Sequence, residues 1–80
     1  MIVCLRFFAS FREIAGMANG EIEIAEGSTV GALLEALEEK HEVFRDRERV
    51  LIAVNGEYVD MKIKLNEGDV VAFFPPVSGG

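Results

Sequence analysis

Apolar and polar positions alternate at the start of the chain in the manner of a β-strand. Within 2–8 the apolar set is Val3, Leu5 and Phe7, and the intervening set is Cys4, Arg6 and Phe8. Successive side chains of a strand point to opposite faces of the sheet. We expect the first set to face the core, because the second set contains the charged Arg6. Phe8 is therefore expected to point away from the core.

The next segments predict a loop, a strand and a helix. Residues 9–20 are expected to form a loop with turns at Gly16 and Asn19-Gly20, and the alternating residues 21–24 a half-exposed strand. A helix is expected to begin after Ser28 or Thr29, either of which can act as N-cap, and to end near His41. Its apolar stripe has the spacing of one helix face: Val30, Leu33, Leu34 and Leu37.

The second half of the chain predicts three more strands. Residues 50–54 are continuously apolar, which is typical of a strand buried on both faces. Asn55-Gly56 favours a hairpin turn because both residues tolerate positive φ, and 57–59 would form the short return strand. Leu65 is expected to anchor the chain before a turn at 66–68. In the last strand, 69–74, alternation separates Val71 and Phe73 on one face from Val70, Ala72 and Phe74 on the other.

This order of elements predicts an α+β fold, in which one helix covers one face of a mixed sheet. One helix cannot cover both faces of a sheet. The second face, which would carry Phe8 and Phe74, must then be partly solvated or used for binding. Aromatic side chains exposed there would form an apolar patch of the kind that marks protein interfaces.

Size and charge exclude several classes of function. The chain has 80 residues, enough for one small domain with little material left for a deep substrate pocket as well as a core, which favours a carrier, binding module or subunit over a stand-alone enzyme. Its net charge of −6 argues against a nucleic-acid binder and against docking on an anionic membrane. The lone Cys4 excludes an internal disulfide and fits a reducing compartment. With no secretory signal and no apolar run long enough for a membrane span, we expect a cytoplasmic protein.

Several chemically active side chains have simpler structural explanations. Cys4 lacks a second cysteine and an evident histidine partner, so we interpret it as a small strand residue. His41 suits the helix end better than a role as base or ligand, and we expect no metal site. The arginines of 45–49 alternate with acids, which is typical of a solvated segment, with contact to acids of a partner as the alternative: Arg45, Arg47 and Arg49. The acidic helix face is also expected to be solvated, with electrostatic fit to a basic partner as the alternative.

The chain is divided into a domain at 1–74 and a tail at 75–80. Pro75 and Pro76 have no backbone N–H, so the last strand must end before them, and consecutive prolines hold an extended conformation. The remaining tail residues are Val77, Ser78, Gly79 and Gly80. Two glycines can thread a narrow tunnel and present a terminal carboxylate to the active site of another protein. A frayed terminus is the ordinary alternative.

Motifs along nearly the whole chain carry a family resemblance. They include Phe7-Phe8-Ala9, Arg12-Glu13, Gly16, Thr29-Val30, Leu33, Ala53-Val54-Asn55 and the closing run GDVVAFFPPVSGG at 68–80. With these motifs the chain resembles the small subunit of molybdopterin synthase, in the MoaD family of ubiquitin-like sulfur carriers. Ubiquitin and the thiamine-pathway carriers share the Gly-Gly end but lack the Phe-Phe-Pro-Pro-Val run.

The resemblance implies a β-grasp fold and a role in molybdenum cofactor biosynthesis. Gly80 would be adenylated by an E1-like (MoeB-like) enzyme and converted to a thiocarboxylate with sulfur from a donor protein. The sulfur would then pass to cyclic pyranopterin monophosphate in the large (MoaE-like) subunit of a heterotetramer. The catalytic side chains would belong to that subunit, and ATP to the activating enzyme, so the chain itself would bind no cofactor. Docking would use Phe8, Phe74 and Tyr58, the last at a position where an aliphatic residue is expected.

The same tail is compatible with other functions. An activated Gly80 could form an isopeptide bond with a lysine of a target protein, which would make the chain a protein modifier. It could also carry sulfur for another pathway. A plain interaction domain with an inert tail is the third alternative.

Overall fold

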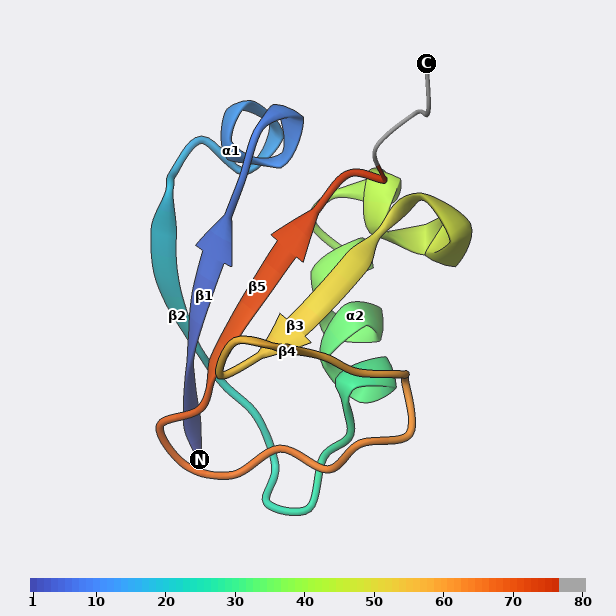
Figure 1. Cartoon of the computed structure of the whole chain (residues 1–80). Helices are drawn as coiled ribbons and strands as arrows, with labels where there is room; N and C mark the ends of the chain where they lie inside the picture. Colours follow the sequence, from blue (N-terminus) through green and yellow to red (C-terminus); the bar gives the residue numbers. More distant parts are fainter. Residues whose placement is uncertain (77–80) are drawn as a thin grey trace.

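Five strands form one mixed sheet, and the main helix packs behind it in the view of Figure 1. The computed structural model describes residues 1–76. The strands are β1 (Ile2–Phe7), β2 (Asn19–Glu23), β3 (Leu51–Val54), β4 (Glu57–Tyr58) and β5 (Val70–Phe74). Their order across the sheet is β2-β1-β5-β3-β4, with β1 parallel to β5 and the other neighbours antiparallel. The predicted α+β architecture is confirmed.

The main helix, α2 (Val30–Glu38), begins at one of the two expected caps. The Thr29 side chain accepts a hydrogen bond from the Ala32 N–H at 3.2 Å, which satisfies a donor of the first turn. The helix ends at Glu38 and not near His41. The N–H groups of Lys40 and His41 both bond to the Leu37 carbonyl, so the chain tightens into a turn instead of continuing the helix.

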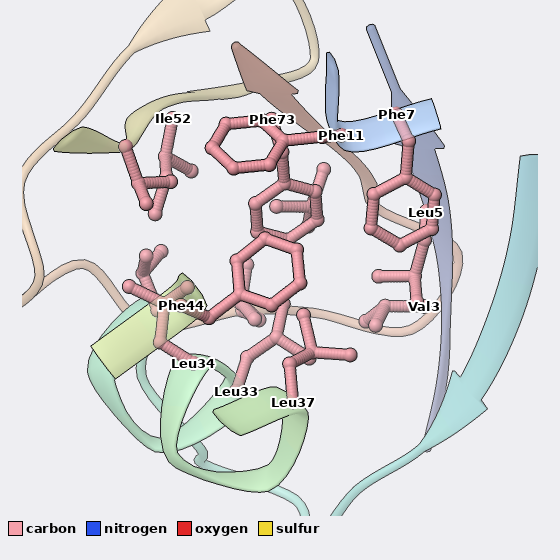
Figure 2. Packing of buried hydrophobic residues seen from close by; sticks show 14 residues of the cluster. Val3, Leu5, Phe7, Phe11, Leu33, Leu34, Leu37, Phe44, Ile52 and Phe73 are labelled. Carbon is pink, nitrogen blue, oxygen red and sulfur yellow. The ribbon is translucent and has the colours of Figure 1, made fainter. Parts of the chain in front are cut away.

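The core lies between α2 and one face of the sheet. The strand residues predicted to face it are all buried: Val3, Leu5, Phe7, Val71 and Phe73. The predicted stripe of α2 is buried opposite them, and Leu65 is buried as the expected anchor. Figure 2 shows Phe44 between the two layers, where its ring centroid lies 5.2 Å from that of Phe11 and 5.5 Å from that of Phe73. Aromatic packing therefore fills the centre of this small domain.

The segment predicted as a loop, 9–20, contains a helix and part of a strand. Helix α1 (Ser10–Ala15) has only one buried side chain, that of Phe11. Its sequence therefore lacks the amphipathic stripe from which a helix could be predicted. The turn at Gly16 is confirmed by its φ of 75°. The turn at Asn19-Gly20 is wrong, because these residues pair with Arg6 and Leu5 in the sheet. A Cβ on Gly20 would lie 2.8 Å from the Met17 sulfur, so glycine provides space here and not a turn.

The charged segment before β3 forms two short 3-10 helices, η1 (Glu42–Arg45) and η2 (Arg47–Arg49). Arg45 and Arg49 are exposed and pair locally with Glu42 and Asp46 at 3.4 and 3.2 Å, as a solvated segment predicts. Arg47 instead lies half-buried, 3.6 Å from Glu38 of α2.

Strand β3 is only partly buried on the face away from α2, so the prediction of burial on both faces is confirmed only in part. Leu51 is 39% exposed, although Ile52 beside it is buried. Long apolar runs are typical of strands covered on both faces, but α2 lies on only one side of this sheet. The hairpin after β3 is confirmed by positive φ at Asn55 (52°) and Gly56 (88°).

Candidate functional site

The sheet face opposite α2 carries a row of residues that strand register sets side by side. Arg6 of β1 pairs with Ala72 of β5, Ala72 with Ala53 of β3, and Ala53 with Tyr58 of β4. Cross-strand partners share a face, so this row runs from a charged side chain over two alanines to an aromatic one. The small alanines form the floor of the face.

Three aromatic side chains gather at one end of this face. The rings of Phe8 and Phe74 stack with centroids 4.6 Å apart and planes 10° from parallel. Tyr58 meets Phe74 edge-on at 6.2 Å and is 71% exposed. We call Phe8, Tyr58 and Phe74 the aromatic surface. They are the residues that the sequence analysis assigned to partner binding, and the structure brings them together from the residue after β1, from β4 and from β5.

A hollow of 270 Å³ lies beside the aromatic surface. Its lining includes the three aromatic residues, Arg6, Ala53 and Ala72. Ala53 is only 7% exposed although it faces away from α2, because larger neighbours shield it. A partly exposed apolar surface around an open hollow is better suited to another protein than to an enclosed small molecule.

Hydrogen bonds from Asn55 hold the β3–β4 hairpin against the start of β5. Its side-chain oxygen accepts from the Val70 N–H, and its side-chain nitrogen donates to Asp69, both at 3.0 Å. The second Asp69 oxygen accepts from the Asn66 N–H at 2.8 Å. This network fixes the hairpin that carries Tyr58. Sequence reasoning identified Asn55 as a turn residue and as part of a family motif, but it did not identify the hydrogen bond to Asp69, because the two residues come together only once the strands are paired.

The tail begins directly at the aromatic surface. Strand β5 ends at Phe74, as the two following prolines require. Pro75 is half-buried and Pro76 is exposed. The predictions made for Val77, Ser78, Gly79 and Gly80 lie outside the described residues.

The structure also places the other two candidates for chemical activity, Cys4 and His41. Cys4 is half-buried on the face opposite α2. The His41 ring lies edge-on to Phe44 at 6.2 Å and so packs against the core. Among residues 1–76, no three His, Cys, Asp or Glu side chains are grouped in a way that could hold a metal ion. No helix in that part of the chain has the length and apolar character needed to cross a membrane.

Comparison with known proteins gives relatives over nearly the whole chain. The model of the ThiS family matches residues 5–80. The molybdopterin synthase sulfur carrier subunit of Escherichia coli is 39% identical over 77 residues, which cover 92% of this chain and 94% of the relative. The small archaeal modifier protein 3 of Haloferax volcanii is 36% identical over 88 residues, covering 95% and 96%.

Solved structures share the fold. A Pyrococcus furiosus protein described as subunit 1 of a molybdopterin converting factor is 42% identical, with a TM-score of 0.86 over 96% of this chain and 99% of that one. In the complex of subunits 1 and 2 of molybdopterin-converting factor from Helicobacter pylori, the matching chain is 30% identical, with a TM-score of 0.73 and full coverage of both chains. The ubiquitin-like β-grasp fold and the resemblance to the MoaD sulfur carriers are both confirmed, and this chain belongs to the ThiS family.

Proposed function

We propose that this chain is the sulfur-carrier subunit of a molybdopterin synthase. Gly80 would receive sulfur as a thiocarboxylate and donate it to cyclic pyranopterin monophosphate in the active site of the large subunit. The observation that carries this proposal is the aromatic surface, a partly exposed apolar patch immediately before the Gly-Gly tail, in which Tyr58 is exposed and Phe8 and Phe74 are half-buried. The identity to sulfur carrier subunits over 92% of the chain supports it.

The chemistry requires that the carboxylate first be activated. A carboxylate is a poor electrophile, so an E1-like (MoeB-like) enzyme would join a Gly80 oxygen to the α-phosphate of ATP and release pyrophosphate. A sulfide-level sulfur delivered by a donor protein would then attack the Gly80 carbonyl carbon, break its bond to AMP and leave a thiocarboxylate. Its sulfur is soft and nucleophilic. Because a dithiolene needs two sulfurs and each chain carries one, each product requires two loaded carriers or two rounds of loading.

Docking and delivery are linked by the length of the tail. Residues 75–80 span at most about 20 Å when fully extended. A large subunit that covers the aromatic surface must therefore keep its reaction centre within that distance of Phe74. The catalytic side chains would then belong to the large subunit. This chain would supply the sulfur, the tail that delivers it and the surface that the large subunit recognises. The Helicobacter pylori complex of subunits 1 and 2 supports such a partner, and we propose a heterotetramer.

The chain would need no cofactor of its own. The sequence has no glycine-rich phosphate-binding motif, so ATP would be bound by the activating enzyme. We propose the cytoplasm as the setting, where Cys4 would stay reduced.

A protein modifier is the second candidate. The 36% identity to small archaeal modifier protein 3 favours it, because the same activated Gly80 could be attacked by a lysine amine on a target protein. A carrier for another sulfur pathway would use the same activation. These functions differ in the acceptor and not in the tail.

The test is the mass of the intact chain after co-expression with the E1-like enzyme of the same genome. We expect a fraction of the chain to exchange one oxygen for sulfur at Gly80. A chain lacking Gly80 and a chain extended by one residue should remain unloaded, with an unchanged thermal midpoint, because both changes lie outside the domain. If the full chain never exchanges oxygen for sulfur, the carrier proposal is wrong.

A further inference from the structure

A second, larger hollow of 490 Å³ lies on the same sheet face, over β1 and β2. Its lining includes Cys4, Arg6, Asn19, Glu21 and Val70. Arg6 and Val70 also line the hollow beside the aromatic surface. The face opposite α2 thus contains two adjoining hollows, and Arg6 is the cationic side chain that lines both.

The Arg6 guanidinium has no partner within residues 1–76. Its cross-strand neighbours are the uncharged Asn19 and Ala72. The ion pairs of the described chain all involve other residues, in or beside η1 and η2. Glu21 lines the same hollow as Arg6 but forms no ion pair with it in this part of the chain. Arg6 is exposed, so its donors face solvent and remain free for a carboxylate.

A docked partner changes the surroundings of this charge. Arg6 is in the same cross-strand row as Ala72, Ala53 and Tyr58, so a protein that covers the aromatic surface and the alanine floor also withdraws Arg6 from water. A guanidinium that is desolvated without a partner opposes binding. A carboxylate can accept two parallel hydrogen bonds from the planar guanidinium of Arg6. It therefore replaces the lost water in one defined orientation.

Resting on the sulfur-carrier function proposed above, we propose that the large subunit presents an aspartate or glutamate to Arg6, and that this pair selects the partner. The chain as a whole carries a net charge of −6, so its long-range field favours a basic protein. A carboxylate placed opposite Arg6 pairs with the desolvated guanidinium. A uniformly basic or purely apolar surface leaves that guanidinium without a partner. Arg6 thereby rejects proteins that the aromatic surface alone would accept.

The experiment is calorimetric titration of the large subunit from the same genome with three variants of the full chain. Arg6→Glu and Arg45→Glu change the net charge equally, but Arg45 lies in the solvated segment η1. We expect Arg6→Glu to weaken binding by about 100-fold or more and Arg6→Met by about 30-fold. Arg45→Glu should change it by less than about 3-fold. Equal thermal midpoints of the variants and the parent chain establish that folding is not the cause.

A charge exchange identifies the acid on the partner. One Asp→Lys or Glu→Lys variant of the large subunit should restore binding to Arg6→Glu while weakening binding to the parent chain. If Arg6→Glu and Arg6→Met bind as tightly as the parent chain, the Arg6 inference is wrong and the carrier function stands. If the parent chain itself does not bind the large subunit, the synthase assignment fails together with the inference.

Discussion

The rings of Phe8 and Phe74 stack 4.6 Å apart on the sheet face opposite α2. The residues just before them, Phe7 and Phe73, stack at 5.3 Å on the core face. Two aromatic pairs, contributed by β5 and by the end of β1 with the residue after it, thus lie on opposite faces of the sheet. The inner pair packs in the core, and the outer pair lies on the surface that we propose for docking.

Replacing each ring of β5 separates these two roles. Phe74→Ala should weaken binding to the large subunit by about 2 kcal/mol or more, as expected for an aromatic anchor. Its cost to folding should be smaller, about 1 kcal/mol from the lost stacking on Phe8. Phe73→Ala, in the matched position on the core face, should lower stability by about 3–5 kcal/mol. Calorimetric binding and chemical unfolding of both variants give the comparison. Equal losses of binding and stability in Phe74→Ala would contradict the assignment.

Substitutions at Tyr58 test whether this tyrosine takes the docking role of the aliphatic residue expected at its position. Because the side chain is 71% exposed, Tyr58→Ala should change the free energy of unfolding by no more than about 0.5 kcal/mol. Binding to the large subunit should weaken, whereas Tyr58→Leu should retain most of the affinity. An undiminished affinity of Tyr58→Ala would remove this residue from the docking surface.

The hairpin network can be tested with a glycine variant. Asn55→Gly keeps the positive φ of 52° accessible but loses the side-chain bonds to Asp69 and Val70. We expect a loss of stability of about 1–3 kcal/mol. Asn55→Ala should cost more, because alanine is also strained at this φ. A double-mutant cycle with Asp69→Ala measures the coupling, and strict additivity would show that the two side chains do not act together.

The fourth prediction concerns Phe44, at the centre of the core. This ring is fully buried and contacts Phe7, Phe11 and Phe73, so Phe44→Ala should destabilise the domain by about 3–5 kcal/mol. In a domain of this size each kcal/mol lowers the thermal midpoint by roughly 4–8 °C. The conservative Phe44→Leu should lose much less. A thermal midpoint of Phe44→Ala close to that of the parent chain would mean that the centre of the core lies elsewhere.

The sequence was informative where one periodicity covered a whole element. Alternation in β1 and β5 predicted which face each phenylalanine occupies, because a strand reverses its side chains at every residue. Both outer phenylalanines of the aromatic surface follow from that rule. Tyr58 follows from the family resemblance, since a two-residue strand has no readable period.

The rest depended on tertiary packing. Phe44 lies in a segment rich in charged residues, and only its burial against the sheet identifies it as part of the core. Helix α1 is held by the burial of Phe11, without a side-chain cap at its start. The row from Arg6 to Tyr58 depends on the register of four strands, and register between distant segments cannot be read from one sequence.

The most direct test of the carrier function follows the sulfur. The thiocarboxylated chain is mixed with the large subunit and cyclic pyranopterin monophosphate, and both the intact mass of the chain and the pterin product are measured. We predict that Gly80 returns to a carboxylate as molybdopterin forms, with two carriers consumed for each product. A thiocarboxylate that persists in the presence of the bound large subunit and its substrate would contradict the account.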